Sequence, residues 1–290
     1  MLYDTESYTR LRAEVRSAVG GTDDDRRLRF LVVDDSAGTD ADVATLQQFD
    51  DVEVLTPPFN LGHQRAIVYG LRHLAGSLAD DDVVVTMDSD GEDQPADVPR
   101  LLAALHTSGA ALVLAERTKR SEPLLFRVLY VLFRVFFRVI AGITVLSGNF
   151  AAQRGDSLKA TISHPSFDLC YSSTLLALRR STERVPCARG SRFAGRSRMN
   201  TSSLIAHGIR MLLPFSERIA ARMLVIAATA FIAFVTVLVL VGVGVITGNA
   251  AIISTSVVAV LFATGFIGFL VLFSSFSKAP TVATKGSSPA

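Results

Sequence analysis

The most informative absence in this 290-residue chain is charge: from Met223 to Ser277 there is no Asp, Glu, Lys, Arg or His. A stretch of this length without charge predicts two membrane-spanning helices of roughly 20 to 25 residues each. We expect the spans at about residues 223–246 and 251–275, with the turn at Gly248-Asn249. The alternative is a buried helical hairpin in a soluble core, but such a hairpin rarely lacks charge for so long.

Cysteine is scarce as well. Cys170 and Cys187 could pair in principle, but a cytosolic location favours free thiols, and their spacing matches no metal-binding motif. Met1 leads directly into charged sequence, so no secretory signal peptide is expected. The five histidines are also scattered without the spacing of metal ligands. These absences argue against a disulfide framework and against a cysteine–histidine metal site.

Charges of the two signs are unevenly distributed along the chain. Residues 1–116 carry 22 Asp+Glu and 9 Lys+Arg, whereas residues 117–222 carry 18 Lys+Arg and 5 Asp+Glu. A basic segment attracts anionic lipid or nucleic acid. Because this segment precedes the predicted membrane spans, we expect lipid phosphate and the bilayer as partners, and no nucleic acid.

Positive residues also predict the orientation in the membrane. Three arginines precede the first span and two lysines follow the second, whereas the turn between the spans has no charge. These residues are Arg210, Arg218, Arg222, Lys278 and Lys285. Because positive residues stay on the cytoplasmic side, both termini and the soluble domain are expected in the cytoplasm, attached to the inner membrane.

Strand-like and helix-like segments alternate through the first part of the chain. Apolar, β-branched segments predict strands at residues 29–33, 52–55, 83–87 and 111–115. Amphipathic segments predict helices at residues 8–19, 41–48, 60–75 and 95–105. Such alternation predicts the α/β class, with a doubly wound and mostly parallel sheet.

Residues 122–141 combine many apolar side chains with evenly spaced arginines, and they are too charged to span a membrane. At about 100° per residue, Arg120, Arg127, Arg134 and Arg138 fall on one narrow stripe. This pattern predicts an interfacial amphipathic helix. The alternative is a core helix whose arginines point to solvent.

The apolar run Val83–Met87 ends in two aspartates, Asp88 and Asp90. Open α/β sheets bind ligands at the carboxyl ends of their strands. Two adjacent carboxylates repel each other unless a cation lies between them, and Mg²⁺ or Mn²⁺ would bind carboxylate oxygen and share its ligands with substrate phosphates. This segment therefore suggests a metal-assisted enzyme that acts on a phosphorylated donor. The alternative is a strand followed by an ordinary acidic turn.

Four motifs occur in a fixed order, and each is weak alone. They are the strand end and acidic turn at residues 32–40, the segment Asn60–Ala66, the segment Met87–Pro95 and the basic loop Arg192–Arg198. Their order and spacing resemble family 2 glycosyltransferases with the GT-A fold, over about residues 3–275. Within that family, the branch that acts on polyprenyl (undecaprenyl or dolichyl) phosphate is the most similar.

The resemblance implies a role for each matched residue. Donor-binding roles fall on Tyr3, Asp34, Asp35, Gly62 and Asp88. Ligands for Mg²⁺ or Mn²⁺ would be Asp88, Asp90 and Glu92. Residues near the acceptor phosphate would be Arg117, Arg120, Arg192, Ser197 and Arg198. The catalytic residues would be Asp90, Arg117 and Arg120.

The resemblance also implies an activity and a domain organisation. The enzyme would move a sugar from a nucleotide-sugar donor to polyprenyl phosphate by direct displacement, with inversion, and a homo-oligomer is possible. Residues 1–121 would form the nucleotide-sugar-binding part of a cytoplasmic GT-A-like domain, and residues 122–222 its acceptor side with the interfacial helix and the basic loop. Residues 223–277 would be the transmembrane helices of this cell-envelope enzyme, and residues 278–290 a disordered tail.

Two departures from the family pattern leave alternatives open. The family begins with an apolar strand before a motif that Tyr3-Asp4-Thr5-Glu6 resembles at its end, and no such strand precedes Tyr3 here. Either the true start lies upstream, which we favour, or donor binding is impaired. Asn149 stands where the family often has Asp, and it cannot act as a base. The alternative functions are a catalytically impaired binding or assembly protein and a haloacid-dehalogenase-like phosphatase.

Overall fold

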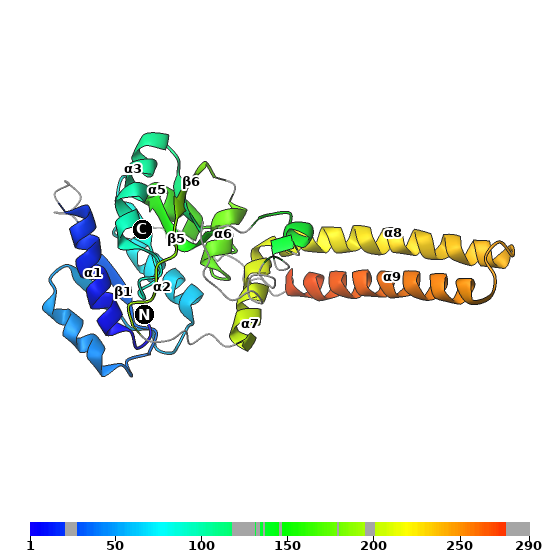
Figure 1. Cartoon of the computed structure of the whole chain (residues 1–290), viewed down its shortest axis with the longest axis horizontal. Helices are drawn as coiled ribbons and strands as arrows, with labels where there is room; N and C mark the ends of the chain where they lie inside the picture. Colours follow the sequence, from blue (N-terminus) through cyan, green and yellow to red (C-terminus); the bar gives the residue numbers. More distant parts are fainter. Residues whose placement is uncertain are drawn as a thin grey trace, which may run out of the picture. The chain divides into compact units, whose positions relative to one another are not determined.

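Figure 1 shows the computed structural model of the chain. It describes residues 1–20, 28–117, 131, 134–135, 137–144, 147–178, 180–194 and 201–276. The chain divides into two compact units. The first unit comprises residues 1–134 and 144–214, and the second comprises residues 135–143 and 215–290.

The described strands of the first unit form two sheets. In the smaller sheet, β1 (Phe30–Val33) pairs in parallel with β2 (Val52–Leu55). The larger sheet contains, in spatial order, β3 (Val83–Thr86), β5 (Ser147–Arg154), β4 (Leu112–Arg117) and β6 (Thr182–Cys187). The strand β5 is antiparallel to both of its neighbours, whereas β4 and β6 are parallel. The predicted α/β class is confirmed, with one antiparallel strand inside the larger sheet.

Helices cover both faces of the larger sheet. One hydrophobic cluster contains residues of α1 (Thr5–Val19) and α3 (Val98–Ser108), and the other contains residues of α2 (His63–Ala75), α5 (Gly155–Ile162) and α6 (Tyr171–Ala177). Along β4, Val113 and Ala115 belong to the first cluster, while Leu112 and Leu114 belong to the second. Because side chains alternate along a strand, β4 is apolar on both faces.

The predicted helices differ from the structure mainly at their ends. The helix predicted over 41–48 is a 3₁₀ helix, η2 (Ala41–Gln48), and the one predicted from Pro95 begins as a 3₁₀ turn, η3 (Pro95–Asp97), before α3. The helix predicted from residue 60 begins at His63, because Gly62 before it has a φ of 75°, outside the helical range. The elements β5, β6, α5 and α6 were not predicted, since no local pattern distinguished them.

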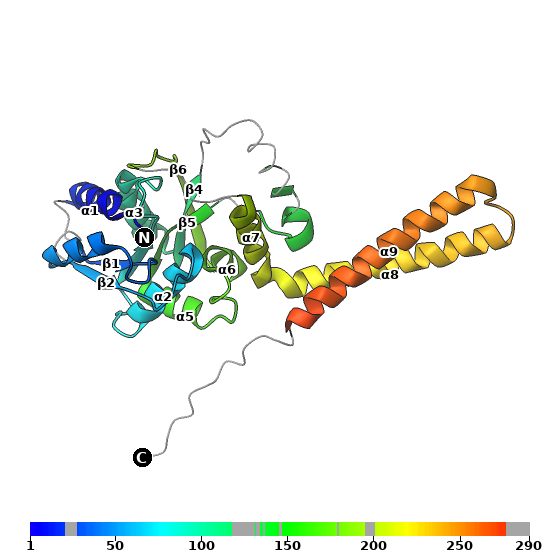
Figure 2. The same cartoon turned by 90° about the horizontal axis from the view of Figure 1, so that it is seen from below.

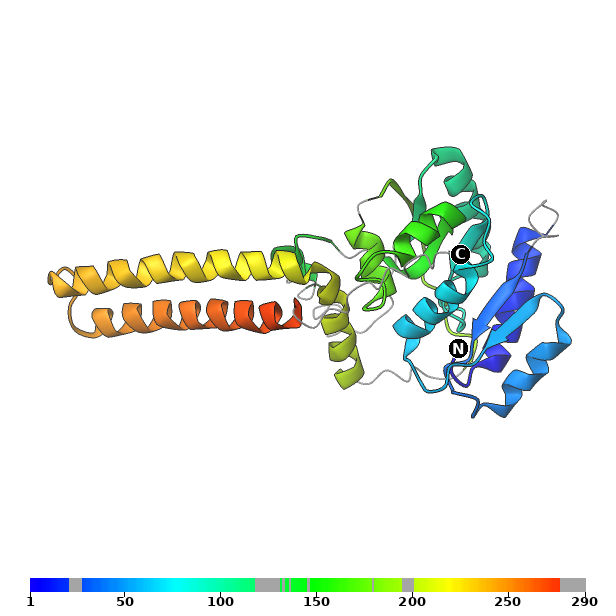
Figure 3. The same cartoon turned by 180° about the vertical axis from the view of Figure 1, so that it is seen from behind.

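The amino terminus lies against the end of β1. The Met1 ammonium donates a hydrogen bond to the Val33 carbonyl at 2.9 Å, and the Asp35 amide donates to the Met1 carbonyl at 2.8 Å. This pair of bonds is the pattern of a parallel bridge opposite Asp34. Figure 3 shows β1 and β2 as adjacent blue arrows with α1 alongside. Whether a further strand belongs before Met1 stays a prediction.

The second unit consists mainly of two long helices. After α7 (Thr201–Leu212) in the first unit and the short η4 (Leu213–Phe215), the chain forms α8 (Ser216–Gly242) and α9 (Gly248–Phe276). These two helices form an antiparallel hairpin in Figure 1, and the turned view of Figure 2 shows them crossing at an angle. Both are long and apolar enough to span a membrane. The link between them is residues 243–247 rather than the predicted Gly248-Asn249, which begins α9; Gly244 in the link has a φ of 76°.

Most of the predicted interfacial helix lies outside the described residues. Its described part, within residues 134–141, is helical. Phe137 there is buried and meets Phe215 edge to face, with ring centroids 5.6 Å apart. Val139 is 63% exposed. This part of the helix therefore has one buried and one exposed apolar side, and the interfacial role stays a prediction.

Candidate active site

Acidic residues from two strand ends meet beside the amino terminus. Asp34 and Asp35 follow β1, and Asp88 follows β3; all three carboxylates lie close enough to act on the pKa of the Met1 ammonium. Burial of that ammonium nevertheless lowers its pKa. The hydroxyl of Ser89 donates to the Asp4 carboxylate at 3.3 Å. The carboxyl ends of β1 and β3 thus converge, as an open α/β fold requires of a ligand site.

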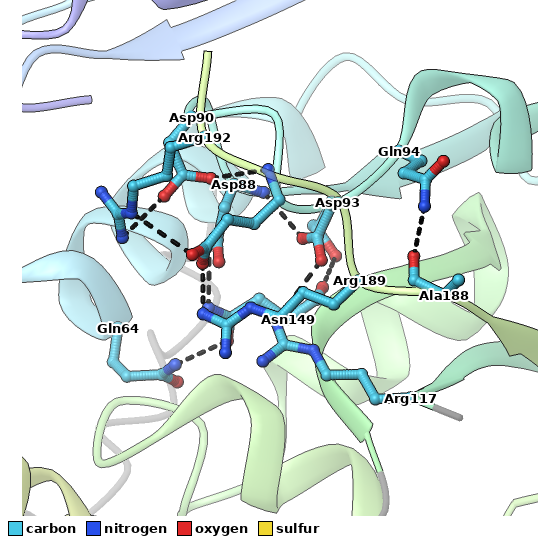
Figure 4. Close-up of polar contacts among 12 residues, drawn as sticks. Gln64, Asp88, Asp90, Asp93, Gln94, Arg117, Asn149, Ala188, Arg189 and Arg192 are labelled. Carbon is cyan, nitrogen blue, oxygen red and sulfur yellow. Dashed lines mark hydrogen bonds and ion pairs between the residues drawn. The ribbon is translucent and has the colours of Figure 1, made fainter. Parts of the chain in front are cut away.

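Arginines cover the acidic loop after β3 (Figure 4). Arg192 lies 2.9 Å from an Asp90 oxygen and also pairs with Glu92, which forms a second ion pair with Arg189. The backbone is tied in the same place, because the Phe193 amide donates to the Asp90 carbonyl at 2.9 Å. Ion pairs and a backbone hydrogen bond therefore hold the loop after β6 against the Asp-Ser-Asp loop.

The acidic cluster holds more negative charge than its arginines offset. Burial, followed by the nearby Asp88 charge, raises the pKa of Asp93 to about 7, against the lowering effect of Arg117. Burial is also the main cause that raises the pKa of Asp90, and Asp88 contributes to the rise. No described cation forms an ion pair with Asp88 itself. Among the described acidic residues 88, 90, 92 and 93, Asp88 is the one without an arginine partner, and the Met1 ammonium is a positive group near it.

The donor set fits a hard divalent cation. Carboxylate oxygen is the ligand that Mg²⁺ and Mn²⁺ prefer, and a cation would relieve the charge around Asp88. Among the described residues, no group of three His, Cys, Asp or Glu is placed to hold an ion. An ion here would take one or two protein carboxylates and fill its remaining positions with substrate phosphate oxygens and water. Glu92 is engaged by two arginines, which gives its predicted role as a ligand no support.

The predicted donor-binding residues lie together, but their polar groups are partly used within the protein. Both carboxylate oxygens of Asp35 accept hydrogen bonds, from the Leu61 amide at 2.6 Å and the Gly62 amide at 2.9 Å. Asp34 accepts from the Ser36 amide at 3.0 Å. Tyr3 is half-exposed, and its hydroxyl meets that of Thr39. Asp35 thus joins the end of β1 to the start of α2.

The residues predicted near the acceptor phosphate divide into two groups. Arg117 and Arg192 lie in the acidic cluster, where Arg117 is 3.4 Å from an Asp93 oxygen and Arg192 pairs with Asp90. The others lie outside the described residues, and their roles stay predictions: Arg120, Ser197 and Arg198. Both described arginines therefore lie beside carboxylates, Asp90 and Asp93, of the predicted nucleotide-sugar-binding part of the domain.

Four residues of the cluster were missed or given no role in the site. Asp93 lies in the Met87–Pro95 motif and Arg189 lies three residues before the basic loop Arg192–Arg198, so their charge was a usable signal. Gln64 and Asn149 join Asp88 through hydrogen bonds across the fold. Their contacts link residues far apart in the sequence, and no local pattern predicts them.

Converging strand ends place a ligand site in an open α/β fold, and comparison with known families shows which family the chain belongs to. The chain matches the family model for glycosyl transferase family 2 over residues 6–167, more than half of its length, and it belongs to that family. No curated protein sequence matches it.

Membership in the family establishes the general activity. The chain is a glycosyltransferase, which implies a nucleotide-sugar donor and an acceptor. The match includes the Asp-Ser-Asp loop at residues 88–90, and it favours the glycosyltransferase interpretation over the phosphatase one.

Proposed function

We propose that this chain is a membrane-anchored glycosyltransferase that moves a sugar from a nucleotide-sugar donor to polyprenyl phosphate, with a divalent cation and with inversion. The observation that carries the proposal is the exposed apolar surface of α8 and α9 in a chain that also contains a glycosyltransferase domain. Large apolar side chains are exposed along both helices, among them Val225, Ile232, Val239, Ile252, Val260 and Val271. A bilayer would cover this surface, and a lipid acceptor lies in the same bilayer.

The chemistry we infer is a single displacement. An oxygen of the acceptor phosphate forms a bond to the anomeric carbon while the bond from that carbon to the donor diphosphate breaks. The nucleoside diphosphate leaves with the bonding electron pair, and attack from the opposite face inverts the configuration. A phosphate nucleophile is already anionic at neutral pH, so Asn149 does not have to act as a base.

The residues of the cluster supply binding and alignment. Asp88 is the carboxylate best placed to hold a divalent cation, which when bound would stabilise charge on the departing diphosphate. Arg117, Arg189 and Arg192 bring positive charge to the same place, and arginine binds phosphate through paired hydrogen bonds. Alignment of two anionic substrates by fixed cations is worth several kcal/mol, about 7–11 in the best intramolecular cases.

The proposed location is the inner membrane of the cell envelope, with the catalytic domain in the cytoplasm. Arg218 and Arg222 lie in the first turns of α8, and the link between α8 and α9 carries no charge. Basic residues at this end and none in the link support an orientation with both ends of the hairpin inside.

The decisive experiment is an assay of the purified full-length protein. With Mg²⁺ or Mn²⁺, labelled UDP- and GDP-sugars and undecaprenyl phosphate, we expect label in an organic-extractable lipid that chelator abolishes. Asp88→Ala should lose this activity, while Asp168→Ala, which removes an exposed carboxylate paired with Arg72, should keep it. The anomeric configuration of the product, read by NMR, tests inversion. Absence of transfer from every common donor would refute the proposal and favour the binding-module alternative.

A further inference from the structure

Asp88 is joined to α6 through two buried side chains, Gln64 and Asn149, which Figure 4 shows near Asp88. The Asn149 side chain lies 3.2 Å from an Asp88 carboxylate oxygen, and the Gln64 side chain lies 2.6 Å from Asn149. The other end of Gln64 is 3.2 Å from the backbone amide of Ser172 at the start of α6. Gln64 is 2% exposed and Asn149 is 6% exposed. We call Gln64 and Asn149 the amide relay.

The relay has one consistent orientation. The Ser172 amide can only donate, so it requires the carbonyl oxygen of the Gln64 side chain. The Gln64 amino group then faces Asn149 and requires the Asn149 oxygen as its acceptor. The Asn149 amino group is left to donate to Asp88. A backbone donor at α6 thus fixes, through two side chains, a donor that points at the Asp88 carboxylate.

We propose that Asn149 and Gln64 are positioning residues that orient Asp88 for the divalent cation. The proposal rests on the proposed function, because it assumes a cation at Asp88. The Asn149 amino group engages one carboxylate oxygen, Oδ1, and leaves Oδ2 for the ion. Groups that hydrogen-bond to a metal ligand fix its direction, and their loss commonly lowers metal affinity 10- to 100-fold.

An amide suits this position better than another carboxylate. Asp88, Asp90 and Asp93 already crowd one site, and the pKa of two of them is raised. Asn149 supplies a donor without adding charge, so it holds Asp88 and does not repel it. This gives Asn149 a role that requires no proton transfer.

Mn²⁺ binding to the full-length protein without substrates, followed by electron paramagnetic resonance, tests the relay directly. We expect Asn149→Ala and Gln64→Met each to raise the Kd for Mn²⁺ at least about tenfold. In the Asn149→Ala background, Gln64→Met should add nothing, because Gln64 acts only through Asn149. Asp88→Ala should abolish the site.

Gln153→Met is the matched control. Gln153 is a second buried glutamine, 1% exposed, whose side chain bonds Tyr171 and Thr161. We expect it to lower the melting temperature as Gln64→Met does and to leave the Mn²⁺ affinity unchanged. If Gln153→Met weakens Mn²⁺ binding as much as Gln64→Met does, the loss of binding reflects general destabilisation of the fold, and the proposal is overturned.

The remaining outcomes separate this proposal from the proposed function. If Asp88→Ala abolishes Mn²⁺ binding while both relay variants bind normally, or if their effects add, the relay is overturned and the cation site stands. If Asp88→Ala binds Mn²⁺ as the wild type does, the relay proposal also falls, because the ion is elsewhere. Sugar transfer to undecaprenyl phosphate is scored in its own assay, so its presence or absence does not depend on either result.

Discussion

The acidic residues after β3 differ in how their charge is offset, although they lie within six positions of one another. Asp90 and Glu92 have arginine partners, and Asp93 lies beside Arg117. Among the described residues, the Asp88 side chain has no arginine partner and accepts a hydrogen bond from the Asn149 side-chain amide. Since burial strengthens the repulsion between like charges, the unbalanced charge at Asp88 affects its neighbours.

Asp93 should make stability depend on pH. Burial and Asp88 raise the pKa of Asp93 to about 7 from the usual 3.8, so the folded protein favours the protonated acid. This contribution is fully present below about pH 4 and is lost as the pH rises through about 7. Asp93→Asn should therefore remove up to about 4 kcal/mol of pH-dependent stability.

Unfolding in urea at pH 5 and pH 8, without divalent cations, measures this effect. Relative to Asp93→Asn, the wild type should be more stable at pH 5 than at pH 8. Asp168→Asn, at an exposed carboxylate, serves as the control and should follow the wild type. An equal difference between wild type and Asp93→Asn at both pH values would contradict the pKa shift.

Gly91 is required for the shape of the same loop. Its φ is +85°, and a Cβ atom there would lie 2.6 Å from the Phe193 ring. Gly91→Ala should cost about 1–3 kcal/mol of stability and should weaken Mn²⁺ binding, because the strained loop carries Asp90. Gly109→Ala is the control, since Gly109 also has a positive φ but open space around it. If both variants bind Mn²⁺ equally, the loop shape does not matter for the site.

At the scale of elements, β1 pairs with β2 along one edge, and along its other edge no strand pairs with it among the described residues. Its pairing with β2 uses the amides of alternate residues, so the amides of Leu31 and Val33 point to the other edge. Met1 makes its parallel bridge at that same edge. Both β1 and the larger sheet contribute apolar side chains to one hydrophobic cluster, with Val32 in β1 and Phe150 and Ala152 in β5.

This other edge of β1 predicts the result of an engineered extension. Five alternating valine and threonine residues added before Met1 should pair with β1 in parallel register. We expect slower hydrogen exchange at the Leu31 and Val33 amides and a melting temperature raised by about 2–4 °C per kcal/mol gained. The control is an extension with proline at the alternate positions whose amides would face β1, because proline has no amide to donate to the β1 carbonyls. Equal exchange in both proteins would show that the edge accepts no strand.

At the scale of the whole molecule, the apolar surface is concentrated on the second unit. The Ile232 side chain in α8 is 67% exposed, and Val225 and Val239 of the same helix are 65% and 58% exposed. In water such a surface favours aggregation, whereas in a bilayer it matches its surroundings. The second unit is therefore the part of the molecule that we expect a bilayer to stabilise relative to water.

A charge on α8 tests the membrane assignment. Ile232→Lys should disfavour insertion by about 2.5–3.5 kcal/mol at the helix centre and should shift the protein from the membrane to the soluble or aggregated fraction. Phe59→Lys is the matched control, because Phe59 is a 62% exposed apolar residue of the first unit. The assay is membrane fractionation after expression. Unchanged membrane retention of Ile232→Lys would argue against a spanning α8.

The sequence by itself determined the features that depend on local pattern. Short apolar, β-branched runs placed β1 to β4 within about two residues, and the absence of charge after Met223 placed α8 and α9. The motif order identified the family that the match over residues 6–167 confirms. Asp88 could be predicted as a site residue because its two-carboxylate motif is local, and its role stays a prediction.

Only the tertiary structure decided the features that join distant residues. The antiparallel β5 lies between β3 and β4, and this order depends on pairing energies that no single segment contains. The relay joins residues 64, 88, 149 and 172, whose hydrogen-bonded pairs are 61 to 108 positions apart in the sequence. Arg192, whose role at a phosphate stays a prediction, forms an ion pair with Asp90, and no local pattern indicated that contact. Periodicity reports which face of an element is buried, whereas the neighbour of each polar group is fixed only when the elements pack together.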